Sequence, residues 1–308
     1  MTTDARQRLR VIAAFAVVYI VWGSTYFAIR IGVHDLPPAL MAGVRYTLAG
    51  AVLLTWTTLR GGLPPWRSPD WRPAIVMGTL MMVGANGLTT WGEKWVPSNQ
   101  AALIAVSSAF WIAWFGTFGP RGHALGLRAK TGLLLGFVGA ILVFVPGHGF
   151  SFAHLGAQFV ILFAAVCWAS GAIYGRSLDV KTPPLIFAAM EMLFGGVVLV
   201  IVGLLSGEAA QWQWTVRGIG AMLYLSAFGS CLAFSTYVWL LKQTTPDKLS
   251  TIAYVNPLIA VFLGWYGLNE ILNRAQIVGT IVLLTGVLLI NTPVRKLIKR
   301  LLRKPQTA

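Results

Sequence analysis

Residues 38–59 read PALMAGVRYTLAGAVLLTWTTL, and residues 184–205 read PLIFAAMEMLFGGVVLVIVGLL. Each stretch is as long as the roughly 20 apolar residues that a helix needs to cross the hydrocarbon core of a bilayer. Both begin at a proline, which the first turn of a helix tolerates because the amide hydrogen would be unpaired there anyway. The two stretches, which start 146 residues apart, therefore predict two membrane-spanning helices.

The rest of the chain has the same apolar character. Hydrophobic residues make up 56% of its 308 positions and charged residues 11%, and the mean hydropathy is +0.71, far from the balance of a soluble domain. The net charge of +15 comes from Lys and Arg between apolar stretches, which favours a membrane over a nucleic acid as partner. The sequence predicts an all-α polytopic membrane protein with ten transmembrane helices at 11–31, 38–59, 73–91, 100–118, 129–145, 155–174, 184–205, 216–241, 249–268 and 275–292.

The distribution of positive charge predicts the orientation of these spans. Of the 24 Lys and Arg residues, 19 fall in segments that would share the side of the amino terminus. The opposite side holds four, which are Arg30, Lys94, Arg217 and Arg274. By the positive-inside rule, both termini are expected in the cytoplasm, which requires an even number of spans.

The two halves of the chain repeat one another. A shift of 146 pairs Trp22 with Trp168, Ser24 with Ser170, Arg30 with Arg176, Pro37-Pro38 with Pro183-Pro184, Gly50 with Gly196 and Trp66 with Trp212. Later the shift drifts by a few residues, pairing Gly132 with Gly279 and Gly139 with Gly286. Because each half holds five spans, an odd number, the second half should enter the membrane inverted. Inverted repeats place a binding site near the midplane and permit alternating access. The alternative is a duplication that only builds a bundle.

Three segments carry a resemblance to a known family: Trp22-Gly23-Ser24-Thr25-Tyr26, Pro37-Pro38 followed by Arg45-Tyr46, and residues 249–270 with Asn256-Pro257. They resemble the signature segments of the EamA family in the drug/metabolite transporter superfamily, over nearly the whole chain. Within it the chain is most similar to bacterial exporters of amino acids, including aromatic ones, and related metabolites. The resemblance implies five-helix repeats at 1–147 and 148–294 and a basic cytoplasmic tail at 295–308. The first half of the family often has an acidic residue just after its fourth span, which matches Glu270 in the second half. Here the corresponding segment of the first half, residues 119–123, reads GPRGH and contains no acid.

Two charged residues lie well inside the predicted spans, away from the span ends: Arg45 and Glu191, which the shift of 146 relates. Charged groups in hydrocarbon are costly, so they are candidates for function. Arg45 is a candidate to attract a substrate carboxylate, and Glu191 a candidate for gating or proton exchange. The alternative is that each ties helices together. Proton coupling and facilitated diffusion both stay open.

Polar and aromatic residues at helical spacing predict the wall of a central cavity. The candidates for substrate binding are Tyr19, Trp22, Tyr26, Asn86, Ser107, Trp111, Trp168, Ser170, Tyr174, Ser230, Tyr237, Tyr254 and Asn256. Aromatic walls with neutral hydrogen-bonding groups and few charges suit an amphipathic zwitterion such as an amino acid, whereas a phosphorylated substrate would need several cations. For any single residue, packing between helices is the alternative. Asn256-Pro257 should break the ninth span, and Pro257 is a candidate hinge.

The sequence thus predicts a secondary transporter that exports aromatic or hydrophobic amino acids across the bacterial inner membrane. A broad-specificity drug/metabolite exporter and a passive channel for neutral solutes remain as alternatives. The chain carries no His-Glu-x-x-His or Gly-x-Ser-x-Gly motif of an enzyme and no phosphate-binding loop of an ATP-driven pump. We expect no cofactor, metal or nucleic acid, a small-molecule substrate and the lipid bilayer as partners, and a monomer or a homodimer. Gly132 and Gly136, four residues apart, allow close approach of another helix within the chain or across a dimer.

Overall fold

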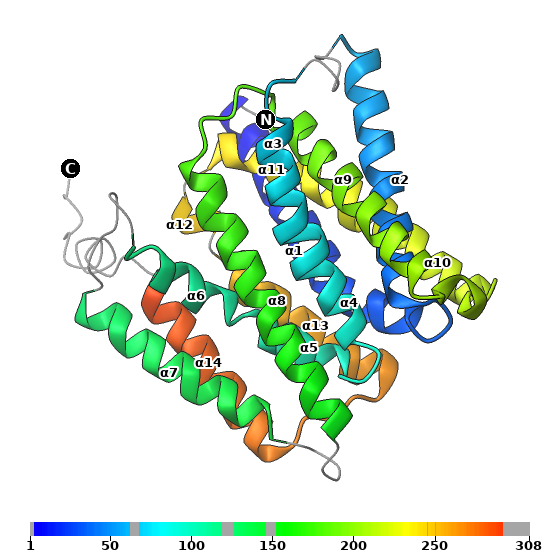
Figure 1. Ribbon diagram of the computed structural model, residues 1–308. Coiled ribbons are helices and arrows are strands. Elements are labelled where there is room, and N and C mark those ends of the chain that lie inside the picture. The colour runs from blue at the N-terminus through cyan, green and yellow to red at the C-terminus, as the bar shows by residue number, and fades with distance from the viewer. Residues whose placement is uncertain are drawn as a thin grey trace, which may run out of the picture.

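The computed structural model describes residues 3–61, 68–118, 126–145, 152–244, 246–249 and 251–291, and regular structure in these ranges is helical throughout. The helices are α1 (Thr3–Gly32), α2 (Pro38–Leu59), α3 (Trp71–Met77), η2 (Gly78–Gly87), α4 (Leu88–Gly92), α5 (Ser98–Ala105), α6 (Ser108–Phe115), α7 (Leu127–Val143), α8 (Phe152–Ser177), α9 (Pro184–Leu205), η3 (Glu208–Gln211), α10 (Val216–Tyr224), η4 (Leu225–Leu232), α11 (Ala233–Gln243), α12 (Pro246–Leu249), α13 (Ile252–Leu268) and α14 (Arg274–Asn291). Figure 1 shows them as one bundle, with α7 and α14 side by side along one edge.

Six helical stretches of the described residues are long and apolar enough to cross a membrane, and shorter apolar helices accompany them. Large hydrophobic side chains lie on the outside of the bundle, including Leu59 and Leu205, which are 81% and 84% exposed. An exposed apolar surface of this extent is typical of a surface that faces lipid. The prediction of an all-α polytopic membrane protein is confirmed.

Apart from α1, which begins at Thr3 and not at the predicted residue 11, the predicted spans coincide with helical stretches to within a few residues. Helices α2 and α9 begin and end where the sequence predicted. Inside three of them the structure differs from a plain α-helix. In the third and eighth spans the middle of the helix is a π-helix, η2 and η4 respectively. In the fourth span a turn at Val106 and Ser107 separates α5 from α6.

The break predicted at Asn256-Pro257 is wrong. Helix α13 continues through Pro257, although this residue has no amide hydrogen to donate inside the helix. The interruption lies in the fourth span instead, where no proline requires it. The role of Pro257 as a hinge stays a prediction.

Helices α2 and α9 pack against each other through glycines. A Cβ atom at Gly43 would lie 2.6 Å from the backbone nitrogen of Val200, and one at Gly50 would lie 2.7 Å from that of Leu193. In return, a Cβ atom at Gly196 would lie 2.4 Å from the backbone nitrogen of Thr47. Residue numbers rise along one helix as they fall along the other, so the two helices run antiparallel.

Helices α7 and α14 meet in the same way. A Cβ atom at Gly132 would lie 2.7 Å from the carbonyl oxygen of Gly286, and one at Gly139 would lie 2.7 Å from that of Gly279. A Cβ atom at Gly136 would strike the ring of Phe110, at 2.1 Å. The close approach that Gly132 and Gly136 allow is therefore used within the chain, and the oligomeric state stays a prediction.

The first helix of each half packs mainly against helices of the other half. Helix α1 contacts α13, α10 and α11, whereas α8 contacts η2, α4, α5 and α6. Gly23 permits the first of these contacts, because a Cβ atom there would lie 2.7 Å from Cβ of Ile259. Any site between α1 and its neighbours is consequently built from both halves of the sequence.

Loops of the two halves are joined by two acids, Asp70, which is buried, and Asp35, which is partly buried. Asp70 accepts hydrogen bonds from the backbone nitrogen of Thr182 at 2.8 Å and from its hydroxyl at 2.6 Å, just before α9. Asp35 accepts a bond from the Thr215 hydroxyl at 2.6 Å, just before α10. These bonds fix the chain where it enters the helices.

The Asp70 bonds predict a pH-dependent stability. The hydroxyl of Thr182, with smaller help from backbone amides, holds the pKa of the Asp70 carboxyl below its usual value despite burial. A lowered folded-state pKa stabilises the fold above the unfolded-state pKa of about 4, and this contribution is lost as the pH falls through the folded-state value. Asp70→Asn should therefore melt several degrees below wild type at pH 7 in detergent, and the gap should close in acid. A gap of equal size at all pH values would contradict this assignment.

Candidate functional site

A buried arginine on α2 is bound to a serine of η4. Arg45 is 5% exposed, and its Nε donates to Oγ of Ser230 over 3.0 Å. Gly229 leaves room for the guanidinium, since a Cβ atom there would lie 3.3 Å from Nη2. The Cζ atom of Arg45 also lies 4.6 Å from the ring centroid of Tyr46. Within the described part of the chain, Nε is the one guanidinium atom with a hydrogen-bond partner, so the other donors can serve a ligand.

An aromatic wall adjoins this arginine. The indole nitrogen of Trp22, on α1, donates to the carbonyl oxygen of Gly229 over 3.1 Å. The Trp22 ring lies 5.1 Å from the ring of Tyr237 and 6.3 Å from that of Phe234, centroid to centroid, and both of these belong to α11. Since Gly229 precedes Ser230, the wall and the arginine belong to one site. We call Trp22, Arg45, Ser230, Phe234 and Tyr237 the Arg45 site.

The local backbone positions the Arg45 site. Gly229 and Ser230 lie in η4, and π-helical turns occur frequently at functional sites. The matching third span contains η2, and there the amide of Asn86 donates to the carbonyl oxygen of Met81 over 2.7 Å. Asn86 therefore braces its own π-helix in the described structure.

Other predicted site residues are held in different ways. Glu191 is 4% exposed and forms no ion pair with Arg45, and within the described residues its carboxyl has no hydrogen-bond partner. On α8, Ser170 donates to the carbonyl oxygen of Val166 in its own helix, while Tyr174 packs against the core between α2 and α9. Trp168 is partly buried on the same helix. The structure therefore does not bring these residues into the Arg45 site.

The remaining residues predicted on α1 and α13 lie in different surroundings. The hydroxyl of Tyr19 lies 2.5 Å from that of Thr251, joining α1 to the start of α13. Tyr26 packs against a separate core cluster that contains Val96. Oδ1 of Asn256 is buried without a partner among the described residues, which makes it available to a ligand. The side chain of Tyr254 lies outside the described residues, as do Trp66 and the segment 295–308.

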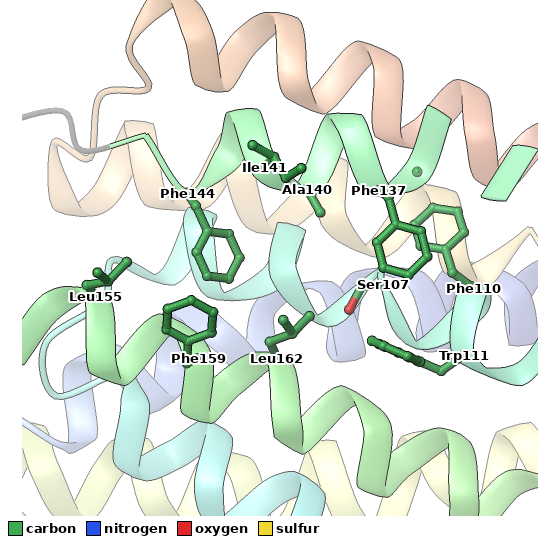
Figure 2. A pocket seen from close by; sticks show the side chains of 11 residues that line it. Ser107, Phe110, Trp111, Phe137, Ala140, Ile141, Phe144, Leu155, Phe159 and Leu162 are labelled. Carbon is green, nitrogen blue, oxygen red and sulfur yellow. The ribbon is translucent and has the colours of Figure 1, made fainter. Parts of the chain in front are cut away.

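Ser107 and Trp111 line a second place, an apolar pocket of about 310 Å³ between α6, α7 and α8. Figure 2 shows the rings of Phe110, Phe137, Phe144 and Phe159 around it. Oγ of Ser107 and Nε1 of Trp111 are buried and have no hydrogen-bond partner within the described ranges. Some predicted residues thus belong to the Arg45 site, Ser107 and Trp111 line this pocket, and several others belong to neither place in the described structure.

Several functional candidates were missed by sequence reasoning. Phe234 follows Ser230 by four residues and precedes Tyr237 by three, so the helical spacing already used could have found it. Tyr224, whose hydroxyl lies 2.6 Å from that of Ser24, was overlooked for want of a motif. Gly229 contributes its backbone carbonyl oxygen, which Trp22 binds, and the space left by its missing side chain, which the Arg45 guanidinium adjoins. Neither contribution produces a pattern in the sequence.

The fold and the Arg45 site define a class: a polytopic membrane protein with a polar, aromatic site where helices of both sequence halves meet. Comparisons with known proteins identify the family within this class. The EamA-like transporter family matches residues 9–145 and again residues 155–292. The chain belongs to this family, as its resemblance implied.

Curated relatives agree with the family. The chain is 36% identical, over 93% of its length and 92% of the relative's, to the uncharacterized inner membrane transporter YedA of Escherichia coli K12. It is 22% identical to the uncharacterized transporter YoaV of Bacillus subtilis, over 91% of this chain and 96% of that one. A crystal structure with 20% sequence identity shares the fold with a TM-score of 0.65, covering 96% of this chain and 99% of its own. The family points to a membrane transporter rather than an enzyme, and the expected location, a multi-pass protein of the inner membrane, is confirmed.

Proposed function

We propose that the protein is a secondary transporter that exports small amphipathic metabolites, in particular aromatic and hydrophobic amino acids. The observation that carries this proposal is the Arg45 site. It offers one fixed cation for a carboxylate, a serine hydroxyl, and the rings of Trp22 and Tyr237 for an apolar side chain. A substrate with several negative charges would find too few cations there.

The proposal includes ten membrane crossings arranged as two inverted five-helix repeats, 1–147 and 148–294. It is supported by the antiparallel packing of helices that the sequence repeat relates, α2 with α9 and α7 with α14. It is also supported by the π-helices η2 and η4, which occupy matching spans. Two-fold related halves of opposite orientation supply two mirror-related conformations.

In the proposed cycle, the site opens in turn to each side of the membrane. Arg45 and Trp22 come from the first half, whereas Ser230 and Tyr237 come from the second. A rotation of one half against the other would therefore change access to the site without dismantling either half. Outward export is inferred from the similarity to amino acid exporters.

A second candidate is a broad-specificity exporter of lipophilic compounds, favoured by the apolar pocket between α6, α7 and α8. Its walls contribute almost no hydrogen-bonding groups besides Ser107 and Trp111. A passive channel is the third candidate. Both differ from the main proposal in how the flux should depend on the concentration and the chemical class of the solute.

Reconstituted liposomes loaded with labelled phenylalanine, tryptophan, leucine or lysine test the proposal. We expect efflux of phenylalanine and tryptophan that saturates with concentration and exceeds lysine efflux, since the five residues of the Arg45 site include a cation and aromatic rings and no acidic residue. Efflux that rises linearly with concentration would favour a channel. No amino acid flux, together with flux of a lipophilic dye, would contradict amino acid export and favour the broad-specificity exporter.

A further inference from the structure

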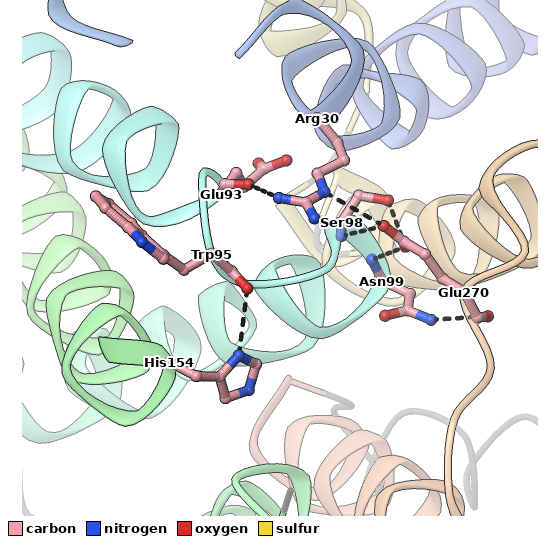
Figure 3. A network of polar contacts seen from close by, with 7 residues as sticks. All are labelled: Arg30, Glu93, Trp95, Ser98, Asn99, His154 and Glu270. Atoms are coloured by element: carbon pink, nitrogen blue, oxygen red, sulfur yellow. Dashed lines mark hydrogen bonds and ion pairs between the residues drawn. The ribbon is translucent and has the colours of Figure 1, made fainter. Parts of the chain in front are cut away.

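A polar network closes the end of the bundle where α1 finishes. The carboxylate of Glu270, just after α13, accepts hydrogen bonds from the backbone nitrogen of Ser98 at 2.8 Å, from its hydroxyl at 2.7 Å, and from the backbone nitrogen of Asn99 at 3.0 Å (Figure 3). The Asn99 amide donates to the Glu270 carbonyl oxygen over 3.2 Å. Glu270 thus satisfies the first amides of α5, where a negative charge is favourable.

Arg30, in the last turn of α1, joins this network to α4. Its Nε lies 4.0 Å from Oε1 of Glu270, and its Nη1 donates to the backbone carbonyl oxygen of Glu93. The Arg30 side chain is 33% exposed, whereas the Glu270 side chain is 9% exposed. The positive charge of Arg30 therefore lies beside Glu270 and reaches only the main chain of Glu93.

The carboxyl of Glu93 is the exception in this network. The residue is fully buried at the end of α4, and neither side-chain oxygen has a hydrogen-bond partner within the described residues. An ionised carboxylate is unfavourable when it is buried without a partner, so the group takes up a proton instead. Burial, and next the charge of Glu270, raises the pKa of the Glu93 carboxyl well above its usual range, against the opposing influence of Arg30 and Arg45.

The other titratable groups around Glu93 are few. Tyr26 lies on α1, and Tyr46 lies beside Arg45 on α2. From α8, Nδ1 of His154 lies 3.2 Å from the carbonyl oxygen of Trp95 (Figure 3). Segment η2 contributes no titratable side chain. Arg30 is therefore the cation best placed to receive a Glu93 carboxylate, because it already bonds the main chain of that residue.

We propose that Glu93 carries the proton of the transport cycle, which it binds while the Arg30–Glu270 network is closed and releases when the network opens. The inference rests on the proposed function and adds its energy coupling. When the end of α13 leaves the start of α5, Glu270 moves away from Arg30 and water enters. The Glu93 carboxyl then loses its proton to water, and its carboxylate pairs with Arg30. Closure after the site has turned to the other side of the membrane returns Arg30 to Glu270, and Glu93 then takes a proton from the water on that other side. One proton thus crosses the membrane in each cycle.

Transport with and without a pH gradient tests this assignment. For one-to-one exchange, a gradient of about one pH unit can sustain roughly tenfold accumulation of substrate. In liposomes with labelled phenylalanine, wild type should approach that ratio, while Glu93→Gln should exchange phenylalanine at equilibrium yet show no accumulation. Glu208→Gln is the control for removing a carboxylate elsewhere in the bundle. The Glu208 carboxylate is hydrogen-bonded, with Oε2 2.8 Å from the nitrogen of Leu40, and its replacement should keep the accumulation.

Saturable wild-type flux that ignores the pH gradient would overturn the inference and leave the proposed function intact. So would accumulation retained by Glu93→Gln. Absence of amino acid flux in wild type would instead contradict the proposed function. Infrared spectra of the wild-type protein in lipid supply a readout independent of flux: a neutral carboxyl band at pH 7 that Glu93→Gln lacks is expected. A wild-type spectrum without such a band would also overturn the proposal.

Discussion

Replacing Arg45 with methionine should raise the KM for phenylalanine efflux by about 10- to 100-fold, because hydrogen bonds to charged groups contribute about 1.5–3 kcal/mol. Methionine keeps the length of the apolar stem and removes the guanidinium, so loss of packing is small. Arg45→Lys keeps the charge but cannot offer the same planar donors, and an intermediate KM is expected. Saturation kinetics in liposomes measure both variants.

Arg274→Met is the control for this substitution, since Arg274 is an exposed arginine at the start of α14. It should leave the KM unchanged. The Arg45→Met protein should also elute and melt like wild type, since the result concerns binding. An unchanged KM for Arg45→Met would remove the arginine from the substrate site and leave it a role in holding η4 through Ser230.

Gly196→Ala should destabilise the protein although it adds only one methyl group. The added methyl would lie 2.4 Å from the backbone nitrogen of Thr47 and 2.9 Å from the carbonyl carbon of Tyr46, so α2 and α9 must separate. Overpacking typically costs about 1–3 kcal/mol, against a gain of up to about 1 kcal/mol from helix propensity. Each kcal/mol lost from the free energy of unfolding lowers the melting temperature by about 2–4 °C, so the melting temperature in detergent should fall by several degrees. Less folded protein should also be recovered.

Gly220→Ala is the matched control, because Gly220 lies in α10 and a Cβ atom there meets nothing within 4 Å. It should melt at or slightly above the wild-type temperature, since alanine favours the helix. If Gly196→Ala and Gly220→Ala melted alike, the close packing of α2 on α9 would not support the fold as described.

Much of the helix layout could be predicted from sequence, since apolar length and helix-starting prolines are local features. Pro38 and Pro184 mark the first residues of α2 and α9 without error. Departures from regular helix were not predicted. The π-helices η2 and η4 arise inside uniform apolar runs, and the turn at Ser107 lies among small residues that also suit a helix. At Pro257 the surrounding bundle keeps α13 continuous where a local rule predicts a break.

The site was predictable only in part, because spacing along a helix shows which residues share a face but not which helix that face meets. Trp22, Arg45, Ser230 and Tyr237 were predicted and come together. Glu191 was predicted from the repeat as the counterpart of Arg45, yet the two form no pair, since equivalent positions in two related halves need not touch. Glu93 lies just past a span end, and its complete burial depends on elements distant in sequence that pack there, among them α8 and Arg30 of α1.

The recognition of a carboxylate by Arg45 is tested most directly by pairing a substrate change with a residue change. The binding of phenylalanine and of phenethylamine, which lacks the carboxylate, would be measured for wild type and for Arg45→Met by calorimetry. Wild type should bind phenylalanine about 10- to 100-fold more tightly than the amine, and the variant should bind the two almost equally. The same preference for phenylalanine in both proteins would show that the carboxylate is recognised elsewhere.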